Sequence, residues 1–255
     1  MAGGHKSESD GVWEEEVDIH SYDVDISSRI TIESLLKYFQ EAAWNHAEQL
    51  GVGYSHLSRS GQVWMLSRMM VVVDSYPAWG QAVVVRTWPC GSRSLLALRD
   101  FELLDREGHR RAAATSGWLV FDQHSRRPLR IEPILASMRM FPDRRSVGCD
   151  APKLAAAETS STSAVFKVKY SDLDLNNHVN NATYARWMLD SYPIEFHRDH
   201  RVRSLAINFL AELDAADSAE LSTIETKDRC MAHTVRRMLD GTQACRAEII
   251  WQASH

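Results

Sequence analysis

The stretch from residue 174 to residue 178 alternates side chains that can hold or move protons. Asp174, Asn176 and His178 stand two positions apart, and in an extended segment alternate side chains share one face. A carboxylate, an amide and an imidazole gathered there would supply a general acid or base and a partner to hold a water. The same residues also suit a capped loop without chemistry, because Asp and Asn favour turns and a lone histidine is often a core residue.

The residues that follow this stretch predict a helix that would position it. Asn180 and Asn181 are suitable N-caps for a helix expected over about residues 183–192. A helix N-terminus offers N–H groups without intrahelical partners and a partial positive charge. We therefore expect these amides to stabilise an oxyanion, should a carbonyl group be attacked nearby.

The chain carries this arrangement twice. The segment DVDISSRITIESLLKYFQEA from Asp23 aligns without a gap with DLDLNNHVNNATYARWMLDS from Asp172. In the first copy, apolar residues recur at helical spacing over residues 32–50, and Gly51 follows as a stop signal. Strand-like runs then occur at 63–73, 82–88, 95–104 and 113–121, and in the second copy at 165–170, 204–210, 219–226, 233–239 and 242–251.

A helix accompanied by several antiparallel strands, given twice, predicts an α+β protein. One helix wrapped by a curved sheet is the hot-dog unit, so we expect a double hot-dog in one chain. The expected boundaries are a disordered tail over 1–15, an N-terminal hot-dog over 16–140, a linker over 141–163 and a C-terminal hot-dog over 164–255.

The repeat also predicts which copy does chemistry. The first copy has Asp25, Ser27, Arg29 and Ser75 where the second has Asp174, Asn176, His178 and Glu212. Only the second set is complete in groups that can move protons, so we expect its residues to form the polar half of one active site. The first copy would then be free to hold a substrate.

Composition excludes several other classes. A net charge of −5 argues against a nucleic-acid binder. Four cysteines without a C-x-x-C pair predict free thiols in a reducing compartment. The sequence has no signal peptide and no membrane-spanning run, so we expect a cytoplasmic protein. It lacks a G-x-S-x-G elbow, which argues against a serine hydrolase of that type. It also lacks a Gly-rich phosphate loop, and His197 and His200 have no partner at a metal-binding spacing, so we expect neither cofactor nor metal.

Three arginine clusters remain as candidate docking sites for an acidic partner, or as solvated faces. They are Arg126, Arg127 and Arg130; Arg144 and Arg145; and Arg236 and Arg237.

Three segments together resemble the acyl-ACP thioesterases of plants and bacteria. They are SYDVDISSRITIESLLKYFQEAAWNHAEQLG, WMLSRMMVVVDSYPAWGQAVVVRTW and SDLDLNNHVNNATYARWML, the last with the pattern D-x-N-x-H-V-N-N-x-x-Y. The resemblance covers about residues 17–251. It implies a double hot-dog fold, an acyl-ACP substrate with acyl carrier protein as partner, and an acyl pocket that we expect in the first unit.

The resemblance also implies catalytic roles for Asp174, Asn176, His178 and Glu212. Plant members often have a cysteine after that glutamate, where this chain has Leu213, which favours carboxylate and water chemistry. We expect Glu212 and Asn176 to position a water, Glu212 or His178 to act as base, and Asp174 to orient His178. Direct attack by Asp174 on the thioester is an alternative.

Three other functions are also compatible with the sequence. They are an acyl-CoA thioesterase on the same fold, a hot-dog hydratase, whose motif is closer to D-x-N-x-x-H, and a non-enzymatic acyl sensor, which would need a DNA-binding domain. A double hot-dog already holds the pair that single hot-dogs form by dimerising, so either a monomer or a homodimer is expected.

Overall fold

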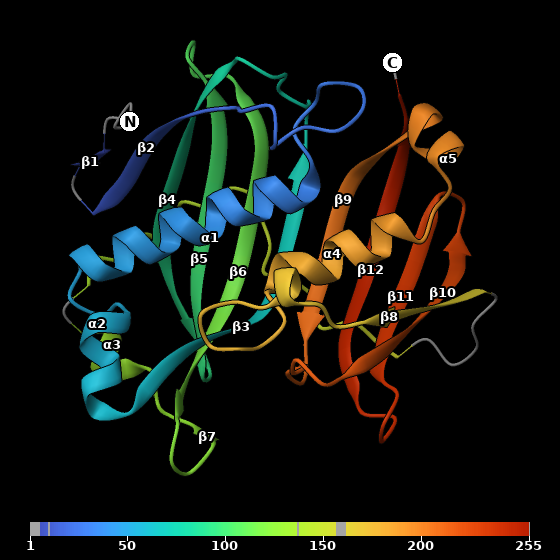
Figure 1. Ribbon diagram of the computed structural model, residues 1–255. Helices are drawn as coiled ribbons and strands as arrows, with labels where there is room; N and C mark the ends of the chain where they lie inside the picture. The colour runs from blue at the N-terminus through green and yellow to red at the C-terminus, as the bar shows by residue number, and fades with distance from the viewer. Residues whose placement is uncertain (1–5, 10, 137, 157–161, 255) are drawn as a thin grey trace. The chain divides into compact units, whose positions relative to one another are not determined.

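The computed structural model describes residues 6–9, 11–136, 138–156 and 162–254. The chain forms two compact units, Met1–Ala151 and Pro152–His255 (Figure 1). Each unit has one long helix and an antiparallel sheet, as predicted for an α+β protein built from two hot-dogs. The division between the units falls inside the stretch 141–163.

The N-terminal unit contains a sheet whose strands run in the order β1, β2, β4, β5, β6, β3, with β7 paired to β6. The strands are β1 (Lys6–Ser9), β2 (Val12–Asp18), β3 (Gln62–Val73), β4 (Ala82–Arg93), β5 (Leu96–Asp105), β6 (Arg110–Asp122) and β7 (Arg127–Pro128). The helices are α1 (Ile32–Gln49), α2 (Tyr54–Leu57), the 3-10 turn η1 (Ser58–Ser60) and α3 (Glu132–Leu135).

Helix α1 begins and ends where the sequence predicts. The Thr31 side chain accepts a hydrogen bond from the Ser34 amide and so caps the first turn. Gly51 follows the last turn with φ +73°, a conformation that glycine adopts at little steric cost. The apolar face of α1 lies on the sheet, where the fully buried Phe39 ring is 5.1 Å from that of Phe101 on β5.

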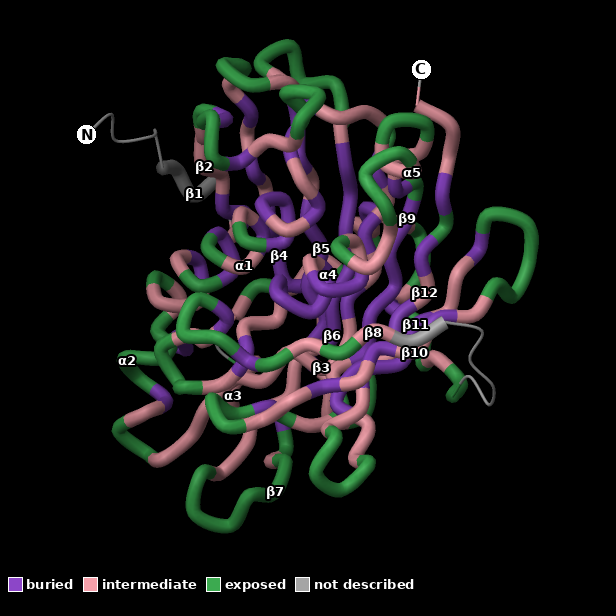
Figure 2. Tube along the Cα trace, turned by 45° about the vertical axis from the view of Figure 1, so that its right-hand side comes forward, coloured by how far each residue is buried: buried purple, intermediate pink, exposed green. Residues whose placement is uncertain are grey.

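The C-terminal unit contains a sheet with the strand order β9, β12, β11, β10, β8. Its elements are β8 (Thr162–Lys167), the 3-10 turn η2 (Tyr170–Asp172), α4 (Asn181–Asp190), α5 (Ile194–Asp199), β9 (His200–Phe209), β10 (Ser218–Lys227), β11 (Cys230–Arg237) and β12 (Gln243–Ala253). Helix α4 is largely buried on its sheet (Figure 2), with Trp187 stacked on Phe166 and Tyr184 packed edge-on to Phe209.

The predicted disordered tail is wrong where strand β2 forms. Val12 and Trp13 are buried, and Val12 packs in a cluster with Trp88 on β4. The acidic residues 14–16 lie along this strand, where Glu14 pairs with Arg86. Residues 6–9 form β1 against β2, whereas residues 1–5 and 10 lie outside the described part of the chain.

The first part of the predicted linker is fixed to the N-terminal unit. The Arg145 guanidinium contacts the carboxylates of Asp100 and Asp150, and the Ser146 amide donates to Asp100 at 2.7 Å. Residues 157–161 lie outside the described part of the chain.

Candidate functional site

The loop that carries the D-x-N-x-H residues is shaped by its own aspartate. Asp174 Oδ1 accepts hydrogen bonds from the backbone amides of Asn176, at 2.8 Å, and His178, at 3.4 Å. The Asp174 amide donates to the His178 carbonyl at 2.8 Å. Asn177 takes the left-handed conformation, φ +63°, which asparagine tolerates better than most residues. The loop is therefore a tight turn that Asp174 closes with both its side chain and its backbone amide.

The N-terminal unit repeats this loop bond for bond. Asp25 Oδ1 accepts from the amides of Ser27, at 2.8 Å, and Arg29, at 3.3 Å, and Ser28 has φ +57°. The same backbone scaffold therefore holds Arg29 in one unit and His178 in the other. Because Asp25 makes these bonds where no imidazole is present, we assign the same loop-shaping role to Asp174.

The loop leads directly into helix α4. Asn180 is its N-cap, and the side-chain oxygen accepts from the Ala182 amide at 2.9 Å. The Asn180 amide itself donates to the carbonyl of Asp172, at 2.8 Å. The buried carboxylate of Asp172 pairs with Arg186 and accepts from the Lys169 amide, which ties the start of the motif to the helix.

Two carboxylates flank the His178 ring. Nδ1 lies 3.3 Å from Glu212 Oε1, and Nε2 lies 3.5 Å from Asp214 Oδ1. The ring is partly shielded, with 33% of its side chain exposed, whereas the two acids are 44% and 62% exposed. This arrangement can exchange protons with a bound water and stabilise a charged imidazolium.

The backbone around Leu213 explains why both acids reach the ring. The Val179 amide donates to the Leu213 carbonyl at 2.9 Å, and His178 and Asp214 face each other in an isolated antiparallel bridge. Leu213 is fully buried, so in this extended segment Glu212 and Asp214 share the opposite face, toward His178. Asp214 was not among the residues predicted from the sequence, although its alternation with Glu212 was a signal for it.

Arg237 on β11 holds the segment that carries the acids. Its Nη2 donates to the Glu212 carbonyl at 2.6 Å, and its Nε lies 3.2 Å from Asp217 Oδ2. That Asp217 oxygen also accepts from the Asp214 amide at 2.9 Å. Tyr184 on α4 is buried. Its burial above all, and also the nearby charge of Glu212, raises the pKa of the tyrosine hydroxyl and keeps it protonated.

The structure places the Glu212 carboxylate against the His178 ring, as predicted, whereas the recorded partners of the Asp174 carboxylate are amides of its own loop and not the ring. Asn176 is exposed on the loop, and the Asp174 carboxylate bonds to backbone amides. Among the described residues, the carboxylates in contact with the ring are those of Glu212 and Asp214.

The predicted correspondence between Ser75 and Glu212 is wrong by one position. The Ile30 amide donates to the Pro77 carbonyl, as the Val179 amide does to that of Leu213, so Tyr76 corresponds to Glu212. Arg29 Nη1 donates to the Tyr76 carbonyl at 3.2 Å. The N-terminal unit therefore places an arginine and a tyrosine where the C-terminal unit has His178 and Glu212.

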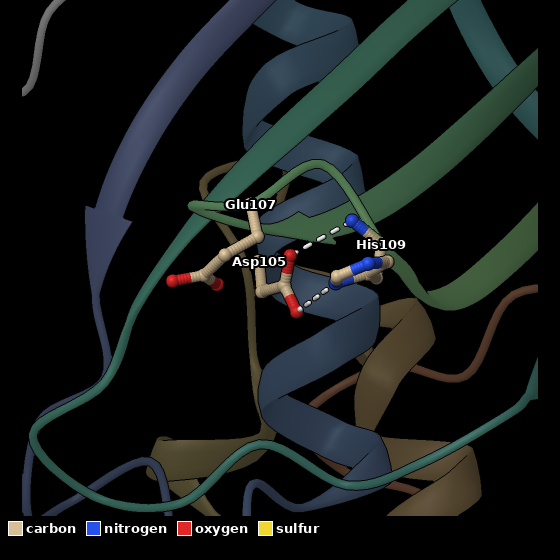
Figure 3. Close-up of side chains that lie close together, drawn as sticks. All are labelled: Asp105, Glu107 and His109. Atoms are coloured by element: carbon tan, nitrogen blue, oxygen red, sulfur yellow. Dashed lines mark hydrogen bonds and ion pairs between the residues drawn. The ribbon is translucent and has the colours of Figure 1, made fainter.

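Three side chains of types that could hold a metal ion gather elsewhere, at the turn between β5 and β6 (Figure 3). Ligand atoms of Asp105, Glu107 and His109 lie within 4.8 Å of one another. Asp105 is already bonded to Arg111 and accepts from the His109 amide at 2.8 Å, so its carboxylate closes the turn. His197 and His200 each contact a backbone carbonyl, of Leu189 and Phe196.

Comparisons with known proteins identify the family of the chain. The family model for the acyl-ACP thioesterase N-terminal domain matches residues 10–138, and that for the C-terminal domain matches residues 155–253. A palmitoyl-acyl carrier protein thioesterase of Gossypium hirsutum, described as chloroplastic, is 30% identical over 96% of this chain. The chain spans 64% of the length of that relative.

Solved structures share the fold over nearly the whole chain. An acyl-ACP thioesterase from Bacteroides thetaiotaomicron aligns with a TM-score of 0.83 at 24% identity and covers 95% of this chain and 98% of that one. A 12:0-ACP thioesterase from Umbellularia californica aligns with a TM-score of 0.85 at 22% identity and covers 97% of this chain and 100% of that one. Among the described residues, no helix is both long enough and apolar enough to cross a membrane.

Proposed function

The chain belongs to the acyl-ACP thioesterase family, and on that premise we propose that it hydrolyses fatty acyl thioesters of acyl carrier protein. The products would be free fatty acid and holo-carrier, which ends fatty acid synthesis. The observation that carries this proposal is the His178 imidazole held within 3.3 Å of Glu212, beside the N-terminus of helix α4.

In this mechanism, Glu212 and His178 hold a water and activate it. As the water oxygen bonds to the thioester carbonyl carbon, its proton passes to the basic group. Collapse of the tetrahedral intermediate breaks the C–S bond, and the same proton is returned to the leaving thiolate. Water is thereby split between the acid and the thiol, and the enzyme is restored.

The oxyanion needs a donor at the start of helix α4. The amides of Asn180 and Ala182 are occupied by the Asp172 carbonyl and the Asn180 side chain. Among the described amides of the first turn, we therefore assign this role to Asn181, which the helix dipole makes a better donor.

Water, rather than Asp174, is the nucleophile in this proposal. The Oδ1 atom of Asp174 accepts from two backbone amides, and turning it onto a substrate would open the loop that positions His178. Asn176 lies two residues before His178 and has an exposed side chain. We propose that this side chain contacts the bound water or the bound substrate.

The acyl chain would lie in the N-terminal unit, between α1 and its sheet. We further propose a cytoplasmic enzyme that acts as a monomer or homodimer. The location is supported by the four cysteines, Cys90, Cys149, Cys230 and Cys245, all of which are free.

The carrier protein would dock on one of the three arginine clusters. Two of them are engaged in internal contacts: Arg144 lies 4.0 Å above the Trp88 ring, and Arg145 and Arg237 form ion pairs with neighbouring acids. Arg126, Arg127 and Arg130 are instead exposed on and after the hairpin that joins β6 to β7. We propose the cluster of Arg126, Arg127 and Arg130 as the carrier site, since acidic partners favour such a patch.

A panel of acyl-ACPs with the matching acyl-CoAs tests the proposed reaction. We expect acid release from the carrier thioesters at a kcat/KM well above that from the CoA esters. Better turnover of the CoA esters would assign the chain to acyl-CoA hydrolysis, and no release from either would reject thioester hydrolysis.

A further inference from the structure

Asp214 stands opposite Glu212 on the His178 ring. The ring nitrogens face different acids, Nδ1 toward Glu212 and Nε2 toward Asp214. A neutral imidazole has one N–H donor and one acceptor nitrogen. Only one of the two carboxylates can therefore accept a hydrogen bond from the neutral ring, and the tautomer decides which one.

We propose that Asp214 is a positioning residue of the reaction, which accepts the Nε2–H of His178 and leaves Nδ1 free to act as the base beside Glu212. The inference rests on the proposed function. The proton of the attacking water would pass to Nδ1, and the imidazolium then formed would be stabilised by carboxylates on both sides. The same Nδ1 proton would move to the thiolate when the C–S bond breaks, so that Asp214 itself never changes its protonation state.

The backbone holds Asp214 in place for this role. Its residue is paired with His178 in the isolated bridge, and its amide donates to Asp217 Oδ2 at 2.9 Å. Asp217 is in turn paired with Arg237, which also binds the Glu212 carbonyl. One arginine on β11 thus fixes the segment that carries both acids.

The N-terminal unit supplies an internal comparison. There the isolated bridge joins Arg29 to Ala78, at the positions that His178 and Asp214 occupy in the other unit. The backbone arrangement therefore needs no acid at this position. The bridge partner is an aspartate where the facing residue is His178, and an alanine where the facing residue is Arg29.

Variants at Asp214 separate its charge from its hydrogen bond. Asp214→Asn keeps an oxygen that can accept from Nε2–H but removes the charge, whereas Asp214→Ala removes both. With the preferred acyl-ACP we expect kcat to fall about tenfold in the Ala variant and less in the Asn variant, with KM unchanged. Asp228→Asn, which removes an exposed charge in the turn between β10 and β11, is the matched control and should behave as wild type.

The pH–rate profile gives a readout that a purely structural role would not move. The charged groups facing the ring are Glu212 and Asp214, with Arg237 behind the Glu212 carbonyl. Loss of one anion about 4 Å away in water-like surroundings should move the acid limb about 0.7 unit to lower pH, in both Asp214 variants. An unchanged profile with wild-type kcat in Asp214→Ala would overturn the inference.

A second measurement does not depend on turnover. Ring ¹⁵N shifts of His178 in the intact protein should report the Nε2–H tautomer at neutral pH, and Asp214→Ala should redistribute it toward Nδ1–H. A wild-type ring in the Nδ1–H form would overturn the inference even if the enzyme is active. An inactive wild-type protein with the Nε2–H tautomer would instead refute the proposed function and leave the Asp214 contact supported.

Discussion

Replacing Asp174 with asparagine should cost much less activity than replacing it with alanine. Asp174 Oδ1 accepts two backbone hydrogen bonds, at 2.8 and 3.4 Å, at a half-buried position. Asparagine keeps this oxygen, so Asp174→Asn loses only the charge assistance, about 1 kcal/mol or less. Alanine loses both bonds, about 2 kcal/mol.

These energies translate into activity through the population of the formed loop. A loss of 2 kcal/mol is about a 30-fold change in an equilibrium, so kcat should fall by at most about 30-fold in Asp174→Ala. It should fall by no more than about fivefold in Asp174→Asn. The assay is the initial rate of fatty acid release from an acyl-ACP at saturating substrate.

The N-terminal unit offers the control for loop stability. Asp25→Ala removes the equivalent bonds from the amides of Ser27 and Arg29. It should lower the free energy of unfolding by a similar amount, measured in urea, without a comparable loss of kcat. If Asp174→Asn proved as inactive as Asp174→Ala, with losses of about 10³-fold or more, Asp174 would be the nucleophile or its orienting base, and the loop-shaping assignment would be refuted.

Three other perturbations follow from the contacts. Arg127→Glu should raise KM for acyl-ACP severalfold and leave KM for a small pantetheine thioester unchanged. Arg198→Glu, at another exposed arginine, should raise neither value. Equal effects of Arg127→Glu on both substrates would argue against docking at Arg127. Arg145→Ala leaves the buried Asp100 carboxylate without its cation and should lower the free energy of unfolding by about 3–5 kcal/mol, which a urea midpoint equal to wild type would contradict. Burial lowers the pKa of His233 to about 4, so below about pH 6.5 the unfolded state binds a proton that the folded state does not. The free energy of unfolding should therefore fall by about 1.4 kcal/mol per pH unit from pH 6.5 down to pH 4. In urea titrations at pH 7, 6 and 5, His233→Gln should show a smaller slope than wild type.

Much of the fold could be predicted because the chain repeats itself. The gapless match of Asp23 with Asp172 is reproduced as matching backbone hydrogen bonds: Thr31 N donates to the Asp23 carbonyl as Asn180 N does to that of Asp172. Helix α1 and the main strands follow from apolar periodicity, which long elements with one buried face display clearly.

The elements that were missed lack such periodicity. Strand β2 places Glu14, Glu15 and Glu16 in succession, and its place in the sheet depends on arginines that are distant in sequence, such as Arg86. Helix α5 has only six residues and is held by aromatic contacts such as that of Phe196 with Trp251. Tertiary contacts of this kind override local composition and are invisible to it.

Only part of the site could be predicted from the sequence. His178 and Glu212 could be found from the motif and the repeat, but the register of the strand before Glu212 could not. The run Asn208-Phe209-Leu210-Ala211 shows no alternation to fix it, and a shift of one residue exchanges the two faces of a strand. That shift hid the correspondence between Glu212 and Tyr76.

The most direct test compares wild type with His178→Ala and Glu212→Gln on the preferred acyl-ACP, with fatty acid release as the readout. We expect each variant to remain folded and to lose about 10²-fold or more in kcat/KM. Release at wild-type rates from both folded variants would show that this imidazole and this carboxylate do not activate the water.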